Sequence, residues 1–433
     1  MDKETFTKYF WKVYRAIESS LKDGETMPPY FMFLTIMAFY VFVMERVEAA
    51  VIEVGIGGLY DCTNIIRKPV AVGITTLGID HVSILGDSLA EIAAQKAGIF
   101  KPGVPAFTVS QQESAMRVLR EQSRTKGCSL TLCSPIEAYE QSVCLGVAGA
   151  IQSVNASLAL QLSKAWLNHN AKAYSTSVEI LNHKYDNILE DEDLSYLPLP
   201  VAMPFKLDAK FQEGLKSCVW PGRFQTVGKN KLTFYLDGAH TQQSIRHCIK
   251  WFNDVSLQHQ IKYQSPVLRV LLFNCTGERK AESLLGPLTD AHFDLVIFSP
   301  NRLTVTKDSS SDLSNFLVDP EKEMQQCITN KEIWNHLIRS MHENELNLAL
   351  DGNSTPQVKP EISAFNSENS LLFSCLSSAI NWLNRFDSAI THKHVLNDKN
   401  DIYAQMLNNA SHIQVLVTGS LHLVGGVLKL IQS

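Results

Sequence analysis

Glu53 and His81 are the two residues of the amino-terminal half whose types and positions point most directly to chemistry. Glu53 lies in an apolar run, 49–54, that predicts a strand buried on both faces, so its carboxylate needs a cation or hydrogen bonds to offset desolvation. His81 follows a second such run, 69–76. If these strands are parallel neighbours, both side chains reach the same sheet edge, where open α/β sheets bind ligands.

The residue types leave the role of this pair open. Together they could form a metal or catalytic site, while each alone could have a local role, as a Glu bonded to an amide or a His that caps a turn. Carboxylate oxygens favour Mg²⁺, whereas an imidazole favours Zn²⁺ or Mn²⁺.

Lys96 interrupts the apolar face that Leu89, Ala93 and Phe100 define on a predicted helix. An ammonium placed there must reach solvent with its tip, find a partner or lose its charge. The ordinary outcome is the first, and the functional alternative is a neutral, reactive amine.

Three short motifs in the carboxyl-terminal half also carry polar groups. The WPGR turn ends in Arg223, whose guanidinium suits a phosphate. The segment LDGAH places Asp237 and His240 directly after a predicted strand, and VTGSLH repeats this design with Ser420 and His422. A helix N-terminus with a hydroxyl and an imidazole suits a carboxylate, although each motif alone is also an ordinary strand-to-helix connection.

Apolar runs alternate with amphipathic segments along the chain, which predicts the α/β class with a mostly parallel, doubly wound sheet. Strands are expected at 49–54, 69–76, 104–109, 232–236, 267–273, 293–298 and 413–417. Helices are expected at 4–22, 28–45, 88–101, 156–166, 241–253, 279–289 and 422–432, the third beginning with a Ser88/Glu91 capping box.

The same reading divides the chain into a first domain, 1–227, and a smaller α/β domain, 228–433. The polar stretch from about 168 to 200 is expected to be a loop. The segment 303–369 is rich in Ser, Asn, Asp and Glu and is expected to be a flexible surface insertion.

Composition narrows the class of protein. The net charge is −5 and no basic run could follow a nucleic-acid backbone, so small-molecule chemistry is favoured. The nine cysteines contain no CxxC pair, which argues against a zinc site and for reduced thiols. The apolar stretch 30–44 is shorter than the ~20 residues that a bilayer requires, so we expect a core helix and no membrane span.

Six segments, taken in order, resemble the folylpolyglutamate synthase family of the Mur ligase superfamily, and together they span nearly the whole chain. They are VIEVGIGGLYDCTNII, LGIDHVSILGDSLAEIAAQKAGIFKPGVPAFT, WPGR, YLDGAH, LLFNCTGER and VTGSLHLVGG. The resemblance implies an ATPase-type first domain, a carboxyl-terminal glutamate-ligase domain, and addition of glutamate to folates through an acyl phosphate.

The resemblance also implies roles for particular residues. Glu53 and His81 would bind Mg²⁺, and Lys96 would be the lysine that is carbamylated beside it. Arg223 would contact the phosphates of ATP. Asp237 and Asn155 would hold the nucleotide, while Ser420, His422 and His240 would face the incoming glutamate. The implied cofactors are ATP and Mg²⁺, with K⁺ as a further cation.

The family's phosphate-binding loop has no counterpart here, because no G-x-x-x-x-G-K-[ST] motif occurs in the sequence. The resemblance places that loop upstream of Met1, so we expect an incomplete first domain, poor soluble expression and little turnover. Two alternatives remain: an impaired chain that still binds folate or a partner protein, and a dihydrofolate synthase.

We expect a monomer in the cytoplasm or the mitochondrial matrix, with folate and L-glutamate as substrates.

Overall fold

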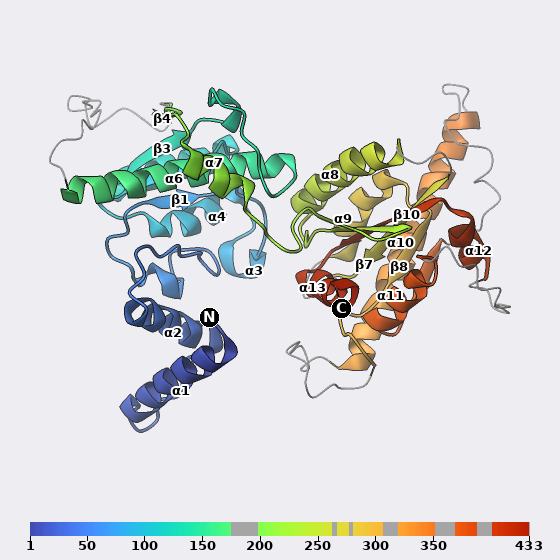
Figure 1. Ribbon diagram of the computed structural model, residues 1–433, viewed down its shortest axis with the longest axis horizontal. Coiled ribbons are helices and arrows are strands. Elements are labelled where there is room, and N and C mark those ends of the chain that lie inside the picture. Colours follow the sequence, from blue (N-terminus) through green and yellow to red (C-terminus); the bar gives the residue numbers. More distant parts are fainter. Residues whose placement is uncertain are drawn as a thin grey trace. The chain divides into compact units, whose positions relative to one another are not determined.

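The computed structural model divides into two compact units, each described here by itself (Figure 1). Unit 1 comprises Met1–Gln141 and Val154–Lys206, and unit 2 comprises Ser142–Ser153 and Leu207–Ser433. The described residues are 1–174, 198–261, 266–276, 280–305, 319–350, 369–387 and 401–432.

Unit 1 begins with two helices, α1 (Lys3–Ser20) and α2 (Tyr30–Met44), which confirm the expected helices at 4–22 and 28–45. They pack through a small apolar cluster that includes Tyr9 and Phe33. Much of the almost entirely apolar α2 stays exposed, so it is not the buried core helix that the sequence predicts. No helix among the described residues combines the length and apolar character needed to cross a bilayer.

The sheet of unit 1 has four parallel strands in the order β1-β2-β3-β4. Helices α4 and α5 cover one face of β1–β3, and α6 packs against the other face through Leu158 and Leu162, so the sheet is doubly wound as expected. The remaining elements of unit 1 are η1 (Cys62–Ile65), β1 (Val72–Ile74), α3 (Val82–Leu85), α4 (Leu89–Lys96), η2 (Ala97–Ile99), β2 (Pro105–Thr108), α5 (Glu113–Thr125), β3 (Ser129–Cys133), η3 (Ile136–Ala138), α6 (Ala150–Tyr174) and β4 (Val201–Ala202).

The strand predicted at 49–54 does not form, and that prediction is wrong. These residues have no ladder partner in the part of the chain that the structure describes, and the side chain of Val51 is 96% exposed. An apolar run becomes a strand only where a neighbouring backbone accepts and donates its hydrogen bonds. Among the described residues, β1 pairs with β2 alone, and its other edge is open.

The loop expected at about 168–200 is wrong at its start, because α6 continues to Tyr174. Residues 175–197 lie outside the described residues. The predicted capping box is confirmed, since the Ser88 side chain accepts from the Glu91 backbone N–H and the Glu91 carboxylate accepts from Ser88.

Unit 2 contains a six-stranded sheet in the order β5-β6-β10-β7-β8-β9, parallel except for β5. Helices α11, α12 and α13 cover one face, and α8, α9 and α10 cover the other (Figure 1). Its elements are α7 (Ala209–Lys216), β5 (Gln225–Gly228), β6 (Leu232–Leu236), α8 (Gln242–Gln260), β7 (Val267–Phe273), α9 (Ala281–Leu288), η5 (Thr289–Ala291), β8 (Leu295–Phe298), α10 (Pro320–Leu350), β9 (Ser370–Leu372), α11 (Leu376–Asn384), α12 (Asp401–Asn409), β10 (His412–Thr418) and α13 (Leu421–Gln432).

The surface insertion expected at 303–369 is wrong for 320–350, which forms α10. Cys327, Asn330 and Trp334 of this helix are buried against the sheet, and Trp334 Nε1 donates to Asn369 Oδ1 at 2.9 Å. The prediction rested on the polar composition of the segment. A long helix can have this composition, because it buries one narrow stripe of residues and exposes the rest. As a result unit 2 is not the smaller unit. It also takes in 142–153, where Gly146 N–H donates to Leu215 O.

Candidate functional site

Two predicted glycine turns lie side by side at the carboxyl ends of β6 and β10. These strands are parallel neighbours, with Leu236 in register with Val417. Beyond the ladder, Asp237 N–H donates to Val417 O at 3.1 Å, and Gly419 N–H donates to Ala239 O at 3.0 Å. The structure therefore brings LDGAH and VTGSLH together at the sheet edge where open α/β sheets bind ligands.

Asp237 is the buried carboxylate of this edge. Its Oδ2 accepts from Phe224 N–H at 3.0 Å, and its Oδ1 accepts from Ala239 N–H at 2.9 Å. Burial raises the pKa of Asp237 to about 6, although both hydrogen bonds and the nearby Arg223 oppose the rise. The first bond ties the WPGR turn to the end of β6.

Arg223 lies against the LDGAH turn. Gly238 N–H donates to Gly222 O at 3.0 Å, and a Cβ at Gly238 would stand 2.3 Å from an Arg223 nitrogen. Only glycine lets the guanidinium approach this closely. Arg223 and Asp237, predicted separately from the sequence, are thus neighbours at one edge of unit 2.

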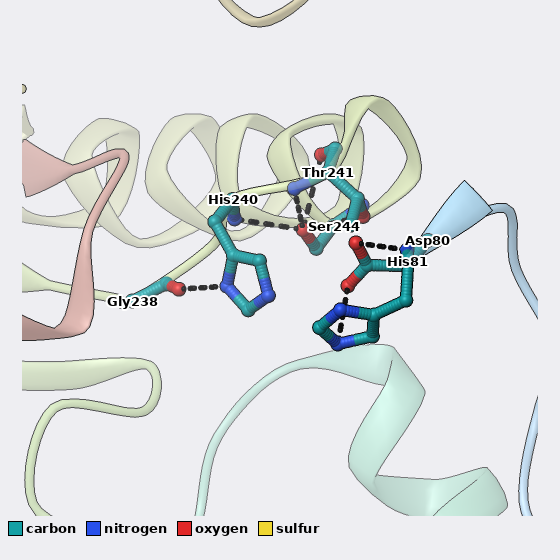
Figure 2. A network of polar contacts seen from close by, with 6 residues as sticks. All are labelled: Asp80, His81, Gly238, His240, Thr241 and Ser244. Carbon is teal, nitrogen blue, oxygen red and sulfur yellow. Dashed lines mark hydrogen bonds and ion pairs between the residues drawn. The ribbon is translucent and has the colours of Figure 1, made fainter. Parts of the chain in front are cut away.

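The three remaining candidates of unit 2 have different surroundings. His240 Nδ1 contacts Gly238 O at 2.9 Å, and its backbone N–H donates to Ser244 Oγ, which also receives the backbone N–H of Thr241 (Figure 2). Ser420 is buried and its Oγ accepts from Asn301 Nδ2 at 3.3 Å. His422 is exposed on the first turn of α13.

Two asparagines of this edge were not predicted. Asn274 directly follows β7, and Asn301 is the third residue after the end of β8 at Phe298. Asn274 Nδ2 donates to Asn301 Oδ1 at 3.2 Å. Each asparagine comes just after an apolar run, which is the signal that drew attention to Asp237, so the sequence offered the means to find them.

In unit 1, His81 occupies a strained position before the short helix α3. Its φ of 51° is in the left-handed region that non-glycine residues rarely adopt. Its backbone N–H donates to Asp80 Oδ1 at 2.8 Å, and its Nε2 lies 3.7 Å from Asp80 Oδ2 (Figure 2). Asp80 is therefore a close partner of His81 that was not among the predicted site residues.

Lys96 ends α4 and is only partly accessible. Burial lowers the pKa of Lys96 because it disfavours the ammonium, while the negative charge of Asp80 raises it. A lowered pKa increases the fraction of neutral amine, the form that reacts with electrophiles. The misfit cation inferred from the sequence is thus a perturbed one in the structure.

Glu53 does not meet the expectation of a buried strand-end carboxylate, because it is exposed and lies outside the sheet. Among the described residues, no group of three or more His, Cys, Asp or Glu side chains could hold a metal. The carboxylate that contacts His81, that of Asp80, accepts the backbone N–H of His81. These residues do not fit a preformed Mg²⁺ site, so the roles of Glu53 and His81 stay predictions. Asn155, half-buried on α6, likewise stays a prediction.

Comparison with known proteins gives a consistent result, although no protein-family model matches the chain. The human mitochondrial folylpolyglutamate synthase is 42% identical over 444 residues, which cover 99% of this chain and 74% of that protein. The folylpolyglutamate synthase of Arabidopsis thaliana is 33% identical over 466 residues, covering 100% of this chain and 72% of that protein.

Solved structures support the same fold. The Mycobacterium tuberculosis folylpolyglutamate synthase complexed with ADP and AMPPCP has a TM-score of 0.59 and 19% identity, covering 98% of this chain and 79% of that chain. The Escherichia coli FolC in complex with DHPP and ADP has a TM-score of 0.58 and 18% identity, covering 98% and 75%. With its Mur ligase-like fold, this chain belongs to the folylpolyglutamate synthase family of ATP-dependent ligases.

Proposed function

We propose that this chain takes part in the ATP-dependent addition of L-glutamate to the γ-carboxylate of folates. The observation that carries the proposal is the assembly of Arg223, Asp237 and Ser420 at adjacent strand ends of unit 2. The resemblance assigned all three to one reaction, and their convergence supports that assignment. ADP and AMPPCP in the structures of relatives support ATP as the co-substrate.

The reaction has two steps. Transfer of the ATP γ-phosphoryl group to the folate γ-carboxylate forms an acyl phosphate and releases ADP. The glutamate amine then attacks the carbonyl carbon, and the tetrahedral intermediate loses phosphate and a proton to give the amide. Arg223 would stabilise charge on the phosphoryl oxygens, and Ser420 would hold the glutamate. Because no preformed metal site is present among the described residues, no step is assigned to Mg²⁺.

A direct test follows the incorporation of labelled glutamate into tetrahydrofolate with ATP and Mg²⁺, with dihydropteroate as a second acceptor to detect dihydrofolate synthase activity. If the planar guanidinium of Arg223 binds phosphate through two hydrogen bonds, Arg223→Lys should lower any turnover at least about tenfold, because an ammonium cannot form both. The exposed Arg246→Lys is the matched control and should leave turnover unchanged.

A second candidate is a chain that binds folate with little catalysis. One observation favours it: Glu53 is exposed and lies outside the sheet, away from the position that a metal ligand at the strand end would need. Calorimetry with folate and with ATP separately would distinguish the candidates. Folate binding without nucleotide binding or turnover would support the second one and contradict the first.

For the location, we propose the mitochondrial matrix, the cytoplasm or both, because the human and bovine relatives are named as mitochondrial. Fractionation of cells that express the chain from its own locus would test this proposal. Recovery only in another compartment would contradict it.

A further inference from the structure

A row of side-chain amides runs through the interior of unit 2 and ends at Ser420. Gln326 Nε2 donates to Asn330 Oδ1 at 2.9 Å, and Asn330 Nδ2 donates to Asn274 Oδ1 at 3.4 Å. Asn274 Nδ2 donates to Asn301 Oδ1 at 3.2 Å, and Asn301 Nδ2 donates to Ser420 Oγ at 3.3 Å. We name this row the amide relay.

The direction of the relay is fixed by thiols as well as by amides. Cys275 donates to Asn330 Oδ1 at 3.7 Å, and Cys327 donates to Asn274 Oδ1 at 3.8 Å. Each of these two amides therefore presents its oxygen to two donors. Reversing either amide would place NH₂ groups against donors inside a buried region, which costs free energy.

The relay is buried and held by its surroundings. Asn274 is 4% exposed and Asn330 is fully buried. Arg302, next to Asn301, forms an ion pair with Glu323 of α10 at 2.6 Å. A polar network of this kind is stable only when its members are satisfied, and it then permits one arrangement of side chains.

The consequence falls on the Ser420 hydroxyl. A hydroxyl has one hydrogen to donate, and Asn301 occupies an acceptor position of its oxygen. Among the described residues, Ser420 Oγ has no acceptor for its hydrogen, although the residue is only 3% exposed. The relay thus leaves Ser420 as a buried donor at the carboxyl edge of the sheet, which suits a ligand atom that accepts.

We propose that Asn274 and Asn301 are positioning residues that commit the Ser420 hydroxyl to donate to a carboxylate of the incoming amino acid. This inference rests on the proposed function, since it names how that function's glutamate site is set. Asn330 and Gln326 of α10 extend the same row, so a helix distant in sequence contributes to the polarity of the site.

The relay itself can be tested in the free chain by NMR of side-chain amides after [¹⁵N]asparagine labelling. Removing the acceptor by Ser420→Ala should shift the Asn301 signal and also that of the Asn274 side-chain amide, which donates to Asn301 and not to Ser420. Asn253, which binds Arg269 elsewhere in unit 2, is the internal control and should not move. Shifts confined to Asn301 would overturn the relay.

The role in binding is tested with L-glutamate as the probe. Asn301→Asp keeps the shape but replaces the NH₂ donor with an acceptor, which should capture the Ser420 hydrogen. We expect L-glutamate affinity to fall at least about tenfold, the fold-change expected when a hydrogen bond to a charged group is lost. Asn409→Asp makes the same chemical change at an exposed position and should leave affinity unchanged.

A double-mutant cycle separates this mechanism from simple charge repulsion. If Asn301 acts through the hydroxyl, Asn301→Asp should weaken binding no further in a Ser420→Ala background. An equal further loss would overturn the relay and leave the proposed function standing. If the wild-type chain does not bind L-glutamate while the NMR result holds, the glutamate-site assignment fails and this inference fails with it.

Discussion

The backbone N–H of Phe224 donates to Asp237 Oδ2 at 3.0 Å, and this bond links the WPGR turn to the end of β6. Phe224 has a φ of 44°, a value that costs a non-glycine residue free energy. The turn therefore keeps an unfavourable backbone conformation that places Arg223 beside Gly238, and the buried carboxylate helps to hold it.

Asp237 should make the stability of the chain depend on pH. Its pKa is raised from 3.8 to about 6. Between these two pH values the Asp237 carboxyl is protonated in the folded state and ionised in the unfolded state. Stability should be fullest below pH 4 and decline through pH 6. Relative to Asp237→Asn, the wild-type free energy of unfolding should fall by up to about 3 kcal/mol. Urea denaturation of both proteins from pH 4 to 7 measures this, and parallel curves would contradict it.

Gly419 should tolerate no side chain. Its φ is +100°, and a Cβ there would lie 2.4 Å from the carbonyl oxygen of Asn274. Gly419→Ala should destabilise the chain by about 2 kcal/mol or more, because backbone strain and overlap combine. Gly425→Ala is the control, since a Cβ there meets nothing within 4 Å and alanine favours the helix. Thermal unfolding checks both, and equal melting temperatures would refute the account.

Lys96 should form a carbamate more readily than an ordinary surface lysine. Burial lowers its pKa, so its neutral amine is available at lower pH. In ¹³C NMR with labelled bicarbonate, we expect a carbamate signal that Lys96→Met removes and that the exposed Lys216→Met retains. A signal unchanged in Lys96→Met would place the modification elsewhere.

Trp334 should be essential for the stability of unit 2. It is 1% exposed, and its indole N–H binds Asn369. Trp334→Ala should cost about 3–5 kcal/mol through the cavity and the lost bond. His342→Ala, at an exposed position of the same helix, should change the free energy of unfolding by less than about 0.5 kcal/mol. Chemical denaturation distinguishes the two variants. A small loss of stability in Trp334→Ala would contradict a core role for α10 and favour the predicted surface insertion.

Unit 1 should be prone to association. Val51, Tyr60, Ile65 and Ile84 are 96%, 86%, 74% and 63% exposed, and the edge of β1 is open among the described residues. The triple variant Val51→Lys, Ile65→Lys, Ile84→Lys should be more soluble than the wild type, and its melting temperature should not be lower. Light scattering tests this, and unchanged association would locate its cause elsewhere.

The sequence alone determined the class of the fold and most of unit 2. The strands at 232–236 and 267–273 appear with the expected bounds, because short, mostly apolar runs between turn signals form strands in a sheet that is covered on both faces. The motifs that contain Asp237 and Ser420 were also visible, since polar groups directly after strands occupy a sheet edge whatever the remaining fold. Arg223 was visible as the last residue of the WPGR turn.

The tertiary structure decided what depends on partners distant in the chain. The run at 49–54 has strand composition, but no strand within the described ranges pairs with it, so Glu53 is not where its sequence predicts. Conversely, the polar segment around Asn330 proved to be a helix that completes the core. Hydrogen-bond pairing and burial are set by what lies alongside, and no local pattern carries that information. For the same reason the sequence could show Ser420, while only the fold shows that Asn301 donates to its hydroxyl oxygen.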